Sequence, residues 1–190
     1  SKMFCRCSAD YFGKEPNTHT CPVCLGLPGS LPYINEEAIK KCMQIGLALN
    51  CKISDTSLFE RKNYFYPDLP KGYQISQYRW PLCIEGWVEI EGLDRKRRIR
   101  INRVNQEEDT GKLTHLGKET LIDFNRCGVP LVEIVTEPDF NSTAEIKEYL
   151  QKLQQTVRYL DISNADMEKG QMRCEPTVNL ILNTKNKILY

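Results

Sequence analysis

Four cysteines near the start of the chain constrain its fold more than any other feature of the sequence. Cys5-x-Cys7 and Cys21-x-x-Cys24 lie in a stretch, residues 1 to 34, that is rich in proline and glycine and shows little helical or strand periodicity. Two close pairs of thiolates suit a tetrahedral structural zinc site. We therefore expect a small zinc-stapled loop region, because the order of this stretch must come from something other than a core.

Other interpretations of these cysteines remain open. C-x-C is the less common half of such a site, and His19 stands near enough in the sequence to replace one thiol. The two pairs could instead be redox-active or simply buried, because redox motifs share this spacing. The nine cysteines are an odd number, and the chain has ample apolar residues for a core, so a secreted disulfide scaffold is disfavoured and a reducing, cytosol-like compartment is expected.

The composition predicts one domain with small attachments. The chain has 190 residues, 41% of them apolar, and a formal net charge of +1, so any contact with nucleic acid must be a local patch. The candidate patch is Arg95 to Arg98 with Arg100 and Arg103, and a solvated hairpin rim explains it equally well. No apolar run could span a membrane, and residues 1–5 are no signal peptide. The first residue is not Met, and a predicted hairpin over residues 178–190 stops at the last residue, so we expect a fragment cut at both ends.

Periodicity after residue 34 predicts helices and paired strands. Residues 35–50 carry apolar side chains on one helical face, and Ser142 begins a capping box ahead of a second, longer helical pattern. From Trp87 to Asn102 the period changes to two, which indicates an antiparallel hairpin, and residues 131–136 form a short apolar strand. Without a regular βαβ alternation, these elements predict an α+β fold with a mainly antiparallel sheet.

Two groups of acidic residues suggest a magnesium site. Glu107, Glu108 and Asp109 follow the second strand of the hairpin, and alone they would fit a solvated loop. Glu133 lies between Val132 and Ile134 in the apolar strand, where a buried carboxylate is costly unless it is paired or binds a metal. Carboxylates from neighbouring strands are what Mg²⁺ needs, since it takes oxygen ligands and leaves positions for phosphate oxygens.

The segment from Arg61 to Gln77 is the natural binding loop. It mixes cations, tyrosines and amides in an irregular stretch punctuated by proline and glycine. Lys62 and Lys71 could neutralise phosphate charge, and its aromatic side chains could hold a base or a ribose. The alternative is a well-packed aromatic loop.

Signature stretches along nearly the whole chain closely resemble the catalytic domain of the B subunit of the tRNA-dependent aspartyl/glutamyl-tRNA amidotransferases. They occur in that family's order: residues 2–5, 15–29, 61–77, 107–115, 123–126, 128–139 and 167–174. The resemblance implies a cradle-shaped domain related to glutamine synthetase. It also implies a protein that activates the side-chain carboxylate of Glu-tRNA(Gln) or Asp-tRNA(Asn) with ATP, before ammonia from a partner amidase displaces phosphate.

The resemblance further implies ATP, Mg²⁺ and Zn²⁺ as cofactors, with the amidase (the A subunit), the small C subunit and misacylated tRNA as partners. It places the protein in the bacterial cytoplasm or an organelle, with no membrane. Residues 1–34 become the zinc-binding region within the cradle domain, and residues 35–190 its remainder. The predicted zinc ligands are Cys5, Cys7, Cys21 and Cys24; the magnesium ligands Glu107, Glu108 and Glu133; the catalytic residues Glu108, Glu133, Lys62 and Lys71; and the nucleotide contacts Arg61, Tyr64, Tyr66 and Arg173.

Some features depart from this pattern. The family's metal site also uses a Glu-x-His pair that should precede Ser1, and residues 169, 171 and 175 replace the usual ones in the motif that begins at Met167. We therefore expect the fragment alone to be inactive. Two other functions stay in competition: a non-catalytic, zinc-dependent tRNA-binding or assembly module, and a glutamine-synthetase-like enzyme acting on a free amino acid. An acid inside an apolar strand argues against the first, because a pure binding module has no need of one.

Overall fold

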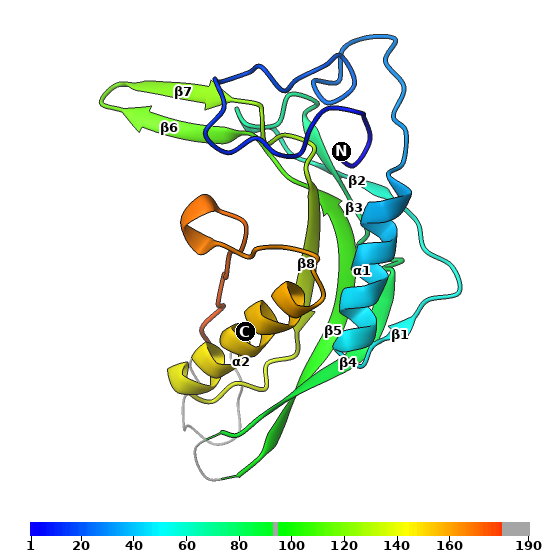
Figure 1. The fold of residues 1–190 in the computed structure, drawn as a ribbon, viewed down its shortest axis with the longest axis vertical. Coiled ribbons are helices and arrows are strands. Elements are labelled where there is room, and N and C mark those ends of the chain that lie inside the picture. The colour runs from blue at the N-terminus through cyan, green and yellow to red at the C-terminus, as the bar shows by residue number, and fades with distance from the viewer. Residues whose placement is uncertain (93–94, 180–190) are drawn as a thin grey trace.

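A four-stranded antiparallel sheet forms the centre of the molecule, in a computed structural model that describes residues 1–92 and 95–179 (Figure 1). Its strand order is β1-β4-β5-β8, with β1 at Lys52–Ile53, β4 at Cys83–Ile90, β5 at Arg97–Glu108 and β8 at Pro130–Thr136. Two smaller antiparallel pairs join β2 (Glu60–Asn63) to β3 (Tyr73–Ser76) and β6 (Lys112–Leu116) to β7 (Glu119–Asp123). The predicted α+β class with a mainly antiparallel sheet is confirmed.

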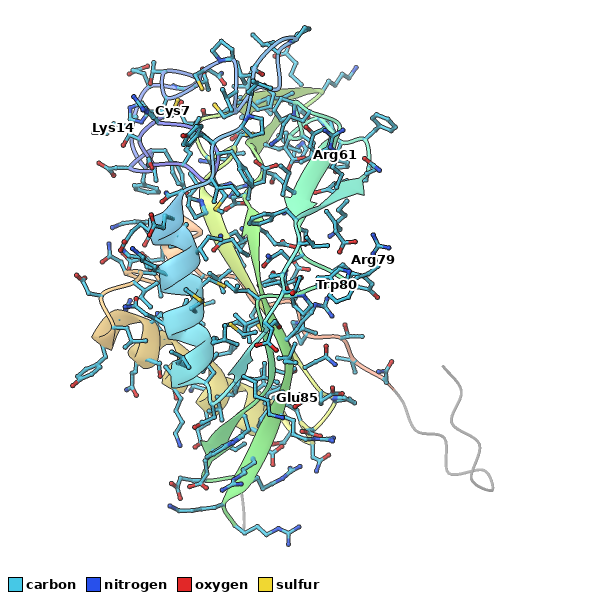
Figure 2. The ribbon with its side chains drawn as sticks, turned by 90° about the vertical axis from the view of Figure 1, so that its right-hand side faces the viewer. Cys7, Lys14, Arg61, Arg79, Trp80 and Glu85 are labelled. Atoms are coloured by element: carbon cyan, nitrogen blue, oxygen red, sulfur yellow. The ribbon has the colours of Figure 1, made fainter. Side chains whose placement is uncertain are left out.

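Both long helices pack on one face of the four-stranded sheet. Helix α1 (Glu36–Ala48) begins at Asn35, whose side chain accepts from the Ala38 amide, and α2 (Thr143–Tyr159) begins at Ser142, whose hydroxyl accepts from the Glu145 amide. Their apolar residues share one core with the central strands, where Ile90, Ile99 and Val104 are fully buried. We call the opposite side, to which Arg79, Trp80 and Glu85 project in Figure 2, the open face.

Strand β5 changes its register against β8 between Ile101 and Arg103. Before this irregularity Ile99 and Ile101 face the helices, and after it Val104 does, three residues further on. Side chains at alternate positions after Val104 therefore lie on opposite sides of the sheet. This change of phase decides which of the acids at the end of β5 face the helices and which face away.

Strand β3 flanks the end of β5 where that strand extends beyond Cys83, the first residue of β4. The pairing of β4 with β5 ends at Cys83 and Val104, and from there the Gln106 amide donates to the Gln77 side chain, just past β3. Residues 1–34 contain no helix or strand and lie next to the β6–β7 hairpin (Figure 1), to which Asn17 is hydrogen-bonded through its backbone and side-chain nitrogens. The acidic end of β5 is thus enclosed by chain on several sides.

The predicted helices, the hairpin from Trp87 and the strand at residues 131–136 are confirmed. The hairpin predicted over residues 178–190 falls mainly outside the described residues, as does part of the turn at residues 92–94. The sequence favours a small core residue over a nucleophile at each of the five other cysteines. Cys42, Cys51, Cys83 and Cys127 are indeed buried, but Cys174 is exposed, so this prediction is wrong for Cys174. Among the described residues, no helix is long and apolar enough to cross a membrane.

Candidate functional site

The four predicted zinc ligands come together in the first 34 residues. The sulfur atoms of Cys5, Cys7, Cys21 and Cys24 all lie within 4.8 Å of one another. A tetrahedral zinc ion with Zn–S bonds of about 2.3 Å separates its sulfurs by about 3.8 Å. The distance between the sulfurs of Cys21 and Cys24 is 3.8 Å, so this donor set fits the ion. His19 is not part of the group that the structure assembles from its described residues.

The crowding of these thiols separates their proton affinities. A hydrogen bond from Cys5 lowers the pKa of Cys24 to about 4 and raises that of Cys5, while burial raises the pKa of Cys7 to about 11. The ammonium of Lys2, which is fully buried, lies 3.6 Å from the Cys24 sulfur and donates to the His19 carbonyl at 2.7 Å. A cation at this position favours the thiolate form that a metal ion requires.

Two of the predicted catalytic residues form a buried ion pair beside the Cys-rich region. The Lys71 ammonium contacts a carboxylate oxygen of Glu108, and the two side chains are only 8% and 3% exposed. That carboxylate also accepts from the Ile75 amide, and Gly26 lies directly against the Lys71 side chain. Because side chains alternate along β5, Glu108 lies on the opposite side of the strand from Glu133, so the prediction that Glu108 and Glu133 lie together is wrong.

Glu107, rather than Glu108, lies on the same side of the sheet as Glu133. Asn105 is directly opposite Glu133 in the pairing of β5 with β8, and Glu107 lies two residues further along β5, so all three share the open face. Glu107 is 5% exposed, and its carboxylate accepts from Ser76, from Gln74 at 3.2 Å and from Asn105 at 3.3 Å. All three donors are neutral.

The electrostatic surroundings of Glu107 favour uptake of a cation. Burial raises the pKa of Glu107, and the hydrogen bond from Ser76 and the charge of Lys62 oppose this change, whereas the negative charge of Glu133 adds to it. Within the described part of the chain, no Lys, Arg or His side chain comes within ion-pair distance of its carboxylate. Lys62, which lies opposite Gln74 in the β2–β3 pair, is the predicted catalytic residue that belongs to this side.

Glu133 is not the buried acid that the sequence predicted. Its side chain is 41% exposed, and a carboxylate oxygen lies 3.8 Å from Arg103. The apolar neighbours Val132 and Ile134 do pack against the core, but the alternation of β8 turns Glu133 itself towards the open face. The inference of a metal site from burial alone therefore applies to Glu107, not to Glu133.

The predicted nucleotide contacts are divided between two places. Arg173 donates to Asp109 at 2.9 Å, and Tyr64 lies near the same acid, since burial and the charges of Asp68, Glu107 and Asp109 raise its pKa. Arg61 instead lies over the ring of Tyr73 at 4.6 Å, and Tyr66 is 56% exposed. Tyr64 and Arg173 thus lie near the acidic end of β5.

Sequence reasoning missed the side chains that hold Glu107 in place. Gln74 and Ser76 alternate with Tyr73 and Ile75 in β3, and this polar-apolar alternation was the available signal that one side of the strand faces polar groups. Asn105 and the buried Lys2 carried no such signal.

Comparison with known proteins assigns the chain to a family. Residues 1–189 match the model of the GatB/GatE catalytic domain. The chain is 56% identical over 181 residues to the B subunit of aspartyl/glutamyl-tRNA(Asn/Gln) amidotransferase from Roseiflexus sp. (strain RS-1), covering 95% of this chain and 37% of that protein. It is 54% identical over 187 residues to the protein of the same name from Thermotoga sp. (strain RQ2), covering 95% of this chain and 39% of that one.

The chain therefore spans less than two fifths of the length of these relatives. A third relative of the same name, from Persephonella marina (strain DSM 14350 / EX-H1), is 53% identical over 180 residues, with 95% of this chain and 38% of that protein covered. Because the family model matches almost every residue, the resemblance inferred from the signature stretches is confirmed. The chain belongs to the GatB/GatE catalytic-domain family.

Proposed function

We propose that this chain is the part of a tRNA-dependent amidotransferase that activates the side-chain carboxylate of Glu-tRNA(Gln) or Asp-tRNA(Asn). In this reaction ATP phosphorylates the carboxylate, and ammonia derived from glutamine then displaces phosphate to give the amide. Family membership supports the proposal, together with the names of the relatives. As partners we propose an amidase (the A subunit), a small C subunit and misacylated tRNA, in the bacterial cytoplasm or an organelle.

One observation carries the chemical part of the proposal. Glu107 is a carboxylate buried against β3 that has only neutral hydrogen-bond donors, next to the second carboxylate of Glu133. Such an acid is costly without a cation, and two acids side by side favour a divalent one. A bound Mg²⁺ would neutralise charge on the transferring phosphoryl group.

The side chains around Glu107 have separate tasks in this proposal. Ser76, Gln74 and Asn105 hold the carboxylate in one orientation, so that little reorganisation is needed when a cation binds. Lys62 and Arg103 bring positive charge to the same face, where phosphate oxygens would lie. Tyr64 and Arg173, near Asp109, are proposed to contact the nucleotide. The Cys5, Cys7, Cys21 and Cys24 site is proposed to hold structural zinc.

The test is Glu107→Gln in the full-length protein, assembled in its complex. The three neighbours of Glu107 can each turn an acceptor towards a glutamine nitrogen, so the variant should fold normally while losing the charge. We expect tRNA amidation and tRNA-dependent ATP hydrolysis to fall roughly 10²- to 10³-fold, since charge stabilisation is the main catalytic contribution to such chemistry. Glutamine hydrolysis by the partner should survive.

The matched control is Glu85→Gln, because Glu85 is an exposed acid on the open face that pairs with Lys52, away from Glu107. It should leave amidation unchanged. Normal amidation by the Glu107→Gln complex would contradict the proposal and favour the alternative of a non-catalytic tRNA-binding or assembly module. That alternative draws on the arginines of the open face, of which Arg98 lies 4.0 Å over Trp87.

A further inference from the structure

Asn105 is the least explained polar residue on the open face of β5. It is fully buried, although asparagine is usually exposed. It lies between two acids on that face, since Glu133 is directly opposite it on β8 and Glu107 is two residues further along β5. Directly opposed residues in an antiparallel pair have Cβ atoms roughly 5 Å apart, so these three side chains are neighbours.

The nitrogen of the Asn105 side-chain amide has a hydrogen-bond partner, whereas its oxygen has none among the described residues. Its nitrogen donates to the Glu107 carboxylate at 3.3 Å. Its oxygen is inaccessible to solvent and has no hydrogen-bond partner within residues 1–92 and 95–179. Leaving a buried acceptor without a hydrogen-bond partner costs about 1–3 kcal/mol of stability, so the unpaired oxygen needs an explanation. Because the nitrogen is held by Glu107, the oxygen is fixed on the other side of the amide.

Arg103 is a nearby side chain that could donate to the unpaired Asn105 oxygen, but it does not do so. Arg103, two residues before Asn105 on the same face, has a buried Nε–H that also lacks a partner among the described residues. Its guanidinium is, however, drawn away, over the Tyr78 ring at 5.0 Å and towards Glu133 at 3.8 Å. The Arg103 Nε–H and the Asn105 oxygen thus form no hydrogen bond with each other, although the two residues are near neighbours on one strand.

We propose that the Asn105 oxygen is a ligand of a divalent cation held together with Glu107 and Glu133, an inference that rests on the proposed function. Amide and carboxylate oxygens are the ligands that Mg²⁺ and Mn²⁺ prefer. A neutral oxygen adds a ligand without adding to the repulsion between the two acids. The amide also sets the position of the Glu107 carboxylate through its nitrogen, so Asn105 orders two ligands at once.

The experiment measures Mn²⁺ binding by electron paramagnetic resonance, without nucleotide, in the full-length protein within its complex. Asn105→Ala removes the oxygen and should raise the Kd for Mn²⁺ roughly tenfold or more. Asn105→Asp keeps an oxygen at this position and should bind Mn²⁺ at least as tightly as the native protein. The control is Asn102→Ala, because Asn102 is an exposed asparagine of β5 that bonds to Glu137 instead. It should change nothing.

The outcomes separate this inference from the proposed function. If Glu107→Gln weakens Mn²⁺ binding but Asn105→Ala, shown by circular dichroism to be folded, does not, Asn105 is no ligand and the function still stands. If Asn105→Asp binds Mn²⁺ more weakly than the native protein, the inference is also overturned, and this result does not depend on the alanine variant folding. If neither Glu107→Gln nor Asn105→Ala changes the Kd, no cation site exists here, and the metal-assisted mechanism falls with it.

Discussion

Glu107 and Glu108 are consecutive residues of one strand, yet their surroundings differ in every respect that matters for function. Glu108 points towards the Cys-rich region and meets the ammonium of Lys71, with both side chains almost completely buried. Glu107 points to the open face, where neutral donors surround it and a second acid lies nearby. We call these places the Lys71 side and the Glu133 side of β5.

The difference supports the proposal that Glu108 is structural and that Glu107 is available for chemistry. An acid with a built-in cation is already neutralised, so a further cation gains little there. An acid held only by neutral dipoles is oriented but not neutralised, which is what a site for an exogenous cation requires. Strand alternation thus gives neighbouring acids separate roles, and each prediction below acts on one side and should spare the other.

The largest effect is expected from removing the proposed zinc site on the Lys71 side. Purified protein should carry about one equivalent of zinc, and Cys24→Ser should abolish zinc binding because it removes one of the four thiolates. The effect on stability should be large, since structural zinc contributes on the order of 10 kcal/mol of folding free energy. Hydrogen exchange should then rise over residues 1–34 while β4 and β5 stay protected. Metal analysis and exchange mass spectrometry measure both.

Cys174→Ser is the control, since Cys174 is an exposed thiol outside the cluster and should leave the zinc content unchanged. Freshly reduced protein without zinc would contradict the prediction, and equal loosening of β4 and β5 would show that the two sides are not separate.

The next effect is expected from breaking the buried ion pair. Lys71→Met leaves the Glu108 carboxylate buried without a cation, which should lower the free energy of unfolding by roughly 3–5 kcal/mol. Replacing both residues, as in Lys71→Met with Glu108→Leu, should restore much of this loss because no buried charge remains. Urea unfolding of the full-length protein measures the free energy of unfolding of each variant.

Glu107→Gln provides the comparison, because it removes no ion pair on the Glu133 side. Its free energy of unfolding should therefore change by less than about 1 kcal/mol. Equal destabilisation by Lys71→Met and Glu107→Gln would remove the distinction between the two acids.

Some features of the fold and of the two sides of β5 could be predicted from the sequence, and others could not. The helices follow from apolar periodicity and their N-caps, and the grouping of Cys5, Cys7, Cys21 and Cys24 follows from their spacing, so both were predictable from local sequence. The facing of Glu107 and Glu108 was not, because it depends on the irregularity near Asn102, which moves the buried positions by one residue. A run of acids looks the same in either phase.

Glu133 shows the same limit from the partner strand. Every residue of β8 is partly buried, so its apolar neighbours gave no sign that one side of the strand lacks a helix. The β6–β7 hairpin was missed because its strands are mostly exposed and lack a strong alternating pattern. The alternation in β3 indicates that Ser76 faces polar groups, but no local pattern identifies Glu107 as its long-range partner.

A smaller effect should come from Gly26, which joins the Cys-rich region to Lys71. Gly26 has a φ of +66°, and an added Cβ would overlap the Lys71 side chain. Gly26→Ala should therefore destabilise the protein by about 1–3 kcal/mol beyond the backbone cost of a positive φ. Gly13, with a φ of +72° and nothing within 4 Å, isolates that backbone cost as Gly13→Ala. Equal unfolding free energies for the two variants would show that the Cys-rich region does not position Lys71.

The smallest effect concerns the arginines of the open face, away from the acids. Arg98 is exposed and lies 4.0 Å over Trp87, whereas Arg100 is neutralised by two hydrogen bonds to Asp139, at 2.9 and 2.7 Å. A free cation releases a counterion when it meets a phosphate, and a paired one releases less. If tRNA lies along this face, Arg98→Ala should therefore reduce the slope of log affinity against log salt by about 1, and Arg100→Ala by less. Filter binding of tRNA to the assembled complex over a salt series measures both slopes. Identical slopes for native protein and Arg98→Ala would leave Arg98 as a solvated strand residue and confine the nucleic acid to other parts of the complex.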